Sequence, residues 1–67
     1  MEKGSLRDCI DKNLKGNEII YITTEEELKN TYIMHTYTRN DIFDDYNGDA
    51  IVVKCWRVDD GICIIIK

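Results

Sequence analysis

The sequence predicts an α+β domain, with two short helices packed on a small, mostly antiparallel sheet of three to four strands that ends in a C-terminal β-hairpin. Three observations predict this class. Two segments begin with helix-capping residues, a β-branched run separates them, and two apolar runs flank an Asp-Gly pair near the C-terminus. The 67 residues have room for one domain, 1–67. A domain this small buries only about 60% of the surface that its unfolded chain exposes, so we expect a thin core.

The first predicted helix covers residues 6–15. Ser5 can cap its N-terminus, its apolar residues recur at helical spacing, and Gly16 is placed to end it. The next segment, residues 18–23, reads EIIYIT and is rich in β-branched side chains, which favour a strand. The N-terminal third of the chain therefore predicts one helix followed by one strand.

A second helix is expected to start after Thr24. Thr24 and Glu27 form a capping box, and three consecutive glutamates place negative charge at the helix N-terminus, where it is stabilising. We expect this helix to end near Asn30, because residues 31–38 are dense in threonine and aromatic side chains that suit a strand. Residues 39–49 contain turn-forming Asn, Asp and Gly, which predicts a loop or a single helical turn.

The C-terminal hairpin joins the apolar runs AIVVKCWRV and ICIIIK. Asp60-Gly61 is a pair typical of a two-residue type I′ turn. That turn fixes the register of the two strands. The facing pairs are then expected to be Asp59 with Ile62, Val58 with Cys63, Trp56 with Ile65, and Lys54 with Lys67.

This register assigns every hairpin residue to one of two faces. One face carries Ile51, Val53, Cys55, Arg57, Ile62, Ile64 and Ile66, and the other carries Val52, Lys54, Trp56, Val58, Cys63, Ile65 and Lys67. The aliphatic first face is the expected seat of the helices. The second face stays apolar, and a soluble monomer seldom exposes such a patch.

We expect self-association through Trp56, Val58 and Ile65 to cover this second face, and so a homodimer. A dedicated partner protein is one alternative. Folding of residues 31–38 back over the patch is the other.

The three cysteines are interpreted as core packing rather than as nucleophiles. Cys9 falls on the apolar side of a helix, and Cys55 and Cys63 alternate with aliphatic residues in the hairpin. Cys55 and Cys63 lie on opposite predicted faces, so they cannot bond to each other. The sequence has no apolar segment of the ~20 residues that cross a membrane and no secretory signal, so we expect a cytoplasmic protein with reduced thiols.

The charge pattern argues against direct binding of nucleic acid. The formal net charge is −4, and the nine Lys and Arg residues are scattered rather than clustered. Binding to a phosphate backbone needs clustered basic residues that displace counterions. The thirteen acidic residues do cluster, so any extended surface field should be negative.

Two alternatives to protein binding remain open. A small metal-dependent nuclease or hydrolase could use Asp44, Asp45 and Asp49, which have suitable carboxylates but no diagnostic spacing. An oligomeric protein that binds single-stranded nucleic acid could stack bases on aromatic side chains, namely Tyr21, Tyr32, Tyr37 and Trp56. The four glycines are isolated and form no phosphate-binding loop, so no cofactor is expected.

The preferred hypothesis is a non-enzymatic protein-binding module. Very short, acidic chains without catalytic motifs are typical of phage and mobile-element proteins that block host defence, such as anti-CRISPR and anti-restriction inhibitors. Such a protein can imitate a phosphate backbone and occupy the basic channel of a nucleic-acid-binding enzyme. The acidic residues expected to face that partner are Glu25, Glu26, Asp41, Asp44, Asp45 and Asp49.

Overall fold

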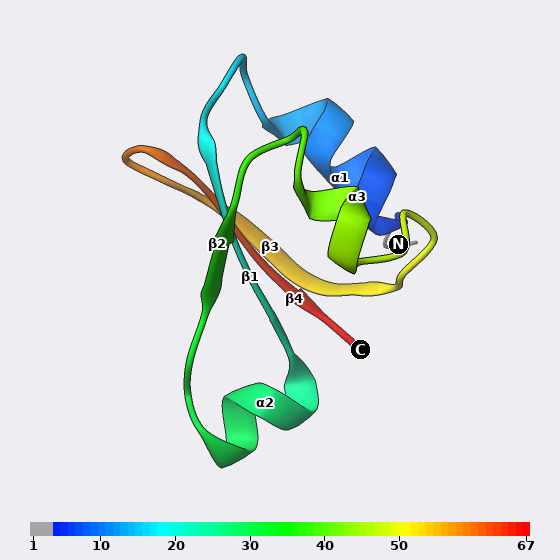
Figure 1. Ribbon diagram of the computed structural model, residues 1–67, viewed down its shortest axis with the longest axis vertical. Helices are drawn as coiled ribbons and strands as arrows, with labels where there is room; N and C mark the ends of the chain where they lie inside the picture. The colour runs from blue at the N-terminus through cyan, green and yellow to red at the C-terminus, as the bar shows by residue number, and fades with distance from the viewer. Residues whose placement is uncertain (1–3) are drawn as a thin grey trace.

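The computed structural model describes residues 4–67 and confirms the α+β class (Figure 1). In chain order its elements are α1 (Leu6–Asn13), β1 (Ile19–Thr24), α2 (Glu25–Asn30), β2 (His35–Tyr37), α3 (Ile42–Asp45), β3 (Val52–Val58) and β4 (Gly61–Ile66). The four strands form one sheet in the order β2-β1-β4-β3. Helices α1 and α3 lie over the same face of this sheet, whereas α2 lies beyond the end of β1.

Helix α1 starts at the predicted cap. The backbone N–H of Asp8 donates to Ser5 Oγ at 3.3 Å, which satisfies one of the free N–H groups of the first turn. The helix ends at Asn13, two residues before its predicted end. Gly16 then takes a φ of +62°, a left-handed conformation that glycine adopts without a steric penalty.

Helix α2 begins and ends as predicted. Thr24 Oγ1 accepts a hydrogen bond from the backbone N–H of Glu27 at 3.1 Å, and the helix ends at Asn30. The strand expected over residues 31–38 shortens to β2, because residues 31–34 form a loop. Helix α3 is the single helical turn expected within residues 39–49.

The sheet is mixed rather than mostly antiparallel. The outer pairs, β1–β2 and β3–β4, are antiparallel, but the central pair, β1–β4, is parallel. Strand β4 is buried along its whole length, from Gly61 to Ile66. A strand that is enclosed on both faces reads as a continuous apolar run. The sequence CIII therefore reflects the central position of β4 in the sheet.

The turn of the β3–β4 hairpin consists of Asp59 and Asp60, one residue earlier than predicted. Neither aspartate has the positive φ that a type I′ turn requires. Val58 pairs with Gly61, and the predicted pairs are wrong by two positions along the partner strand. A shift of two residues preserves the side-chain alternation, so most face assignments still hold.

Gly61 serves strand packing instead of the turn. It pairs with Ile19 of the parallel neighbour β1, and a Cβ atom at Gly61 would come within 1.7 Å of the Ile19 carbonyl oxygen. The Ile19 N–H also donates to the carbonyl oxygen of Asp60 at 3.0 Å. The glycine therefore allows the hairpin to approach β1 closely at the start of the parallel ladder.

A register shift near the start of β3 overturns part of the predicted face assignment. The pairing passes from Val52 with Ile66 to Lys54 with Ile65, so Val53 is an extra residue in β3. Such a bulge reverses the alternation of side chains on one side of it. Val52 consequently enters the core at 4% exposure, whereas Ile51, predicted on the core face, is 60% exposed.

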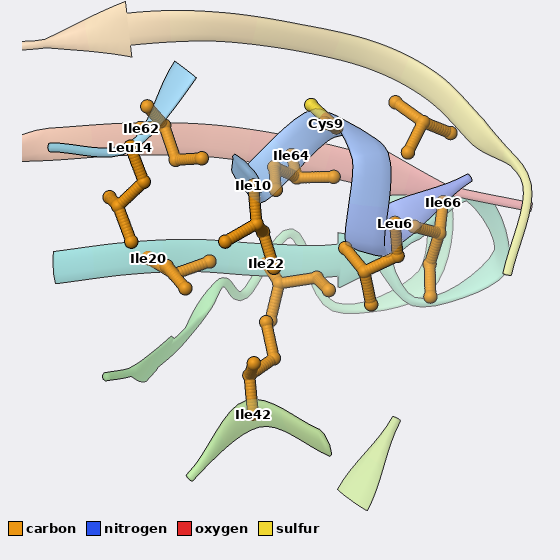
Figure 2. Close-up of a cluster of buried hydrophobic side chains, with 11 residues drawn as sticks. Leu6, Cys9, Ile10, Leu14, Ile20, Ile22, Ile42, Ile62, Ile64 and Ile66 are labelled. Carbon is orange, nitrogen blue, oxygen red and sulfur yellow. The ribbon is translucent and has the colours of Figure 1, made fainter. Parts of the chain in front are cut away.

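The core fills the space between the sheet and the α1 and α3 layer (Figure 2). Its members are apolar and buried: Leu6, Cys9, Ile10, Leu14, Ile20, Ile22, Ile42, Val52, Ile62, Ile64 and Ile66. Six of them are isoleucine or valine side chains from β1, β3 and β4. Helix α1 contributes three more, and Leu14 follows directly after it.

The opposite face of the sheet is closed by its own neighbouring side chains. Cys63 is flanked in the register by Tyr21 and Trp56, and it is only 8% exposed. Ile65 is likewise 8% exposed, yet Trp56 remains 44% exposed. The second face of β4 is therefore largely covered within one chain, but the indole of Trp56 beside it is still partly exposed to solvent.

Within residues 4–67, no helix combines the length and the hydrophobicity needed to cross a lipid bilayer.

Candidate functional site

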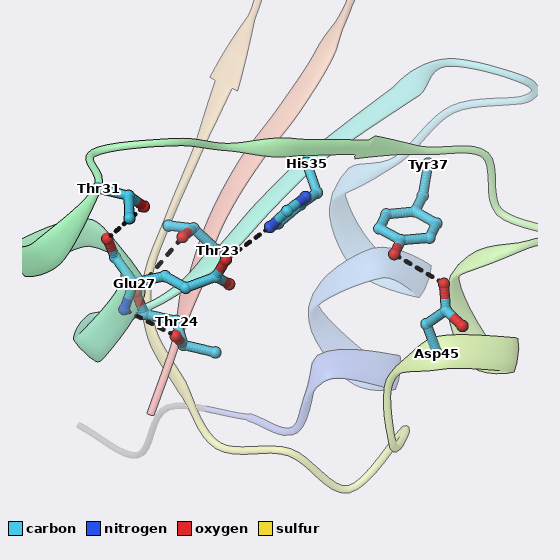
Figure 3. Close-up of polar contacts among 7 residues, drawn as sticks. All are labelled: Thr23, Thr24, Glu27, Thr31, His35, Tyr37 and Asp45. Carbon is cyan, nitrogen blue, oxygen red and sulfur yellow. Dashed lines mark hydrogen bonds and ion pairs between the residues drawn. The ribbon is translucent and has the colours of Figure 1, made fainter.

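The six acidic residues predicted to face a partner form two separate groups. Glu25 and Glu26 lie on the first turn of α2, and the four aspartates lie on α3 and the loops that flank it. Figures 1 and 3 both show α2 and α3 at different ends of the molecule. All six side chains are exposed, but the fold does not bring them into one surface.

The α2 group has a local structural role. Glu25 and Glu26 place negative charge at a helix N-terminus, where unsatisfied backbone N–H groups favour it. Their neighbour Glu27 accepts a hydrogen bond at 2.8 Å from His35 Nε2 of β2, and its backbone carbonyl accepts from Thr31 Oγ1 at 3.0 Å (Figure 3). This end of the molecule is therefore organised around the α2 caps and the contact with β2.

We define the α3 acidic patch as Asp41, Asp44, Asp45 and Asp49. Two of its carboxylates anchor the patch to β2 and the loop after it. Thr38 Oγ1 donates to Asp41 Oδ2 at 2.9 Å. The Tyr37 hydroxyl donates to Asp45 Oδ2 at 2.8 Å (Figure 3). The hydrogen bond to Asp45 raises the pKa of Tyr37 to about 12, so this phenol remains a donor at neutral pH.

The other two carboxylates of the patch face solvent. Within residues 4–67, the side chains of Asp44 and Asp49 have no hydrogen-bond or ion-pair partner, since the ion pairs there are His35–Glu27 and Arg57–Glu18. The loop that carries Asp49 is nevertheless ordered by its backbone. Its carbonyl groups accept hydrogen bonds from the first turn of α1, through Gly48 at 3.0 Å and Ala50 at 2.8 Å.

Arg7 borders the α3 acidic patch. The guanidinium of Arg7 lies 4.5 Å from the centre of the Phe43 ring and packs against Gly48. This cation–π contact holds Arg7 on the ring face instead of in an ion pair. Between residues 40 and 53 the chain contains four aspartates and no Lys or Arg. The local charge of this segment is therefore −4.

The three residues predicted to mediate self-association share the face opposite α1. Trp56 is 44% exposed, Val58 is half-buried and Ile65 is 8% exposed. Beside them lies a shallow hollow of about 310 Å³, lined in part by Tyr21, Met34 and Val58. Ile65 is already buried by its own chain, so Trp56 and the rim of the hollow provide the accessible apolar surface.

The residues of the two alternative hypotheses are dispersed. Among residues 4–67, no three His, Cys, Asp or Glu side chains lie close enough together to hold a metal ion, and Asp44, Asp45 and Asp49 form no such group. Tyr21 and Trp56 do share a sheet face, on either side of Cys63. Tyr37 belongs to the opposite face with the core, and Tyr32 lies in the loop after α2, so the four rings form no continuous stacking platform.

A groove between α1 and β3 was not predicted from the sequence. Its volume is about 1010 Å³, and its lining includes Cys9, Asn13 and Cys55. The amide nitrogen of Asn13 lies 3.7 Å from Cys9 Sγ and 3.9 Å from Cys55 Sγ. The sequence does indicate that Cys9 and Cys55 could lie close together. Cys9 is on the apolar side of a helix, and Cys55 is on the predicted helix-facing side of β3.

No protein-family model, curated protein or solved structure matches this chain.

Proposed function

We propose that this chain is a non-enzymatic protein-binding module that inhibits a nucleic-acid-binding enzyme. The α3 acidic patch occupies the basic channel of that enzyme in place of the phosphate backbone. The observation that supports this proposal is that two carboxylates, Asp44 and Asp49, have no partner among residues 4–67 and are held on a short helix and an ordered loop.

The anchoring of the patch favours such a role. A carboxylate that imitates a phosphate must keep its place while it is removed from water, and each flexible side chain that is ordered at an interface costs about 0.5–1.5 kcal/mol. The hydrogen bonds of Asp41 and Asp45, together with the backbone bonds of the loop, fix the patch before binding. Little additional ordering is then needed when a partner binds.

The charge distribution favours a basic partner. The net charge of the chain is −4, and the segment that carries the patch contains no Lys or Arg. Opposite charge on the partner accelerates association and makes binding sensitive to salt. The DNA and RNA channels of nucleases are lined by basic residues that neutralise the phosphate backbone. A nuclease of a host defence system is therefore the class of partner that we propose.

A competition experiment tests this function. Labelled duplex DNA is bound to each member of a panel of restriction endonucleases and CRISPR effector nucleases, and fluorescence anisotropy follows its release as this protein is added. We expect displacement of DNA from at least one enzyme, with a weaker effect as the salt concentration rises. Absence of displacement across the panel would count against inhibition by phosphate mimicry.

We also propose that two copies associate through the face that carries Trp56. Trp56 exposes its indole on this face, close to an apolar hollow, and both surfaces gain free energy when they are removed from water. Association of two such faces would leave both α3 acidic patches free, because α3 lies on the opposite side of the sheet. A dimer would then present two patches to its partners.

A further inference from the structure

The groove between α1 and β3 contains two thiols from distant parts of the sequence. Cys9 lies on α1 and is 8% exposed, and Cys55 lies on β3 and is half-buried. Both residues line the groove, so a small reagent can reach the space between them. Neither thiol is in a disulfide, and the third cysteine, Cys63, belongs to the opposite face of the sheet.

Asn13 holds the two sulfur atoms as a pair. Its side-chain amide contacts Cys9 Sγ at 3.7 Å and Cys55 Sγ at 3.9 Å, and it also donates to the Cys9 carbonyl oxygen at 2.9 Å. The Arg57 guanidinium donates in turn to the backbone carbonyl oxygen of Asn13 at 2.5 Å. Asn13 is thus fixed from two sides, and an N–H donor aimed at sulfur stabilises a thiolate.

The two thiols have different acidities. A hydrogen bond from Cys55 lowers the pKa of Cys9 to about 7, and the contact with Asn13 acts in the same direction while burial opposes it. The same bond to Cys9 raises the pKa of Cys55. Near neutral pH, Cys9 is then substantially a thiolate and Cys55 is its thiol partner. The charged residues among those that line the groove are Asp8 and Lys12 of α1 and Lys54 of β3.

We propose that Cys9 and Cys55 form a peroxide-reactive dithiol, in which Cys9 is the nucleophile, Cys55 is the resolving thiol and Asn13 positions them. The site would act on hydrogen peroxide or a small organic hydroperoxide. It requires no partner protein, so it is independent of the function proposed for the α3 acidic patch.

The reaction balances in two steps. In the first, the Cys9 thiolate attacks one peroxide oxygen, the O–O bond breaks, and Cys9 becomes a sulfenic acid as hydroxide leaves and is protonated to water. In the second, the sulfur of Cys55 attacks the sulfur of Cys9, the S–O bond breaks, and the displaced hydroxide leaves as water with the thiol proton of Cys55. Two thiols are oxidised by two electrons, and one peroxide is reduced to two waters.

Trypsin separates the three cysteines, which allows a direct test. Cleavage after Lys and Arg places Cys9 in residues 8–12, Cys55 in residues 55–57 and Cys63 in residues 58–67. The full chain is treated with one equivalent of hydrogen peroxide at neutral pH, blocked with an alkylating reagent, digested without reductant and analysed by mass spectrometry. We expect the peptides 8–12 and 55–57 to be joined and to separate on addition of dithiothreitol.

Three variants sharpen the result. Cys63→Ala should leave the crosslink unchanged. Cys55→Ser should lose it and retain a Cys9 sulfenic acid that dimedone traps. Asn13→Ala should slow the oxidation of Cys9 several-fold at pH 7 and move its pH midpoint upward, because the thiolate loses a donor. If a variant does not fold, the peptide map of the unaltered chain still shows whether Cys9 and Cys55 form the disulfide. A crosslink that involves Cys63, a crosslink between two chains, or three thiols that stay reduced would overturn the proposal.

Discussion

At the scale of single residues, Tyr32 carries identifiable strain. It follows α2 with a φ of +55°, a left-handed conformation that costs a residue with a Cβ roughly 1–2 kcal/mol. Its ring is 82% exposed, so little packing would be lost on replacement. We expect Tyr32→Gly to stabilise the protein by about 0.5–1 kcal/mol after the added chain entropy of glycine is counted. Thermal or urea unfolding measures the change.

The neighbouring loop position supplies the control for this prediction. Ile33 is also exposed and is not among the residues with positive φ. Ile33→Gly should therefore lose stability, since glycine then adds only unfolded-state entropy. Equal destabilisation by the two variants would show that the conformation at Tyr32 is not strained.

The residue-scale predictions from sequence succeeded where a contact is local. Ser5 and Thr24 were identified as caps because each bonds an N–H group only three residues away. The Cys9–Cys55 pair was missed because it depends on how α1 crosses β3, which short-range patterns do not determine. Cys55 and Cys63 alternate onto opposite faces of the hairpin, which excludes a bond between them, but this alternation does not indicate which thiol lies across the groove from Cys55.

At the scale of elements, Gly61 occupies a position in the sheet that has no room for a side chain. A Cβ there would approach the Ile19 carbonyl oxygen to 1.7 Å, and this oxygen belongs to the backbone of the neighbouring central strand β1. We expect Gly61→Ala to destabilise the fold by at least about 3 kcal/mol, because the parallel β1–β4 ladder must separate to admit the methyl group. Chemical denaturation, or failure to fold, would report this loss.

Gly48→Ala is the matched control for this substitution. A Cβ at Gly48 would meet the guanidinium of Arg7 at 2.8 Å, but that group is the end of a flexible side chain and can move. We expect a loss of less than about 1.5 kcal/mol, mostly from the contact of Arg7 with Phe43. A Gly61→Ala protein as stable as Gly48→Ala would contradict the close approach of β1 and β4.

The elements themselves were largely predictable, whereas their pairing was not. The helix starts, the first strand and the C-terminal hairpin follow from capping residues and β-branched runs. The hairpin turn was placed one residue late because Gly61 was interpreted as a turn residue, when β1 is what requires it. The parallel central pair and the bulge at Val53 likewise depend on tertiary contacts between distant strands.

At the scale of the whole molecule, the Trp56 face predicts the oligomeric state. Burying the exposed part of the indole contributes on the order of 2 kcal/mol per chain, which favours a dimer at high concentration. In sedimentation experiments we expect the parent to approach twice its 7.9 kDa mass and Trp56→Glu to remain monomeric. Ile51→Glu removes an exposed apolar side chain elsewhere and should stay dimeric. A monomeric parent at high concentration would remove this proposal.

The sequence predicted which residues of the candidate site are exposed but not how they are grouped. Runs of Glu and Asp identify solvent-facing carboxylates without the fold. Only the fold separates Glu25 and Glu26 from the α3 acidic patch, because α2 lies beyond the end of β1 while α3 packs beside α1. The predicted acidic surface is therefore two surfaces, one on α2 and one around α3. Equal charge changes can be made on each, and their effects on binding can be compared.

That comparison is the most direct test of the proposed function. The DNA competition is repeated with two double variants of equal charge change, Asp44→Lys with Asp49→Lys, and Glu25→Lys with Glu26→Lys. We expect the first pair to weaken displacement of DNA at least tenfold, an effect that shrinks as salt rises, and the second pair to weaken it much less. Equal losses in both pairs, or full displacement by the variant at Asp44 and Asp49, would contradict binding through the α3 acidic patch.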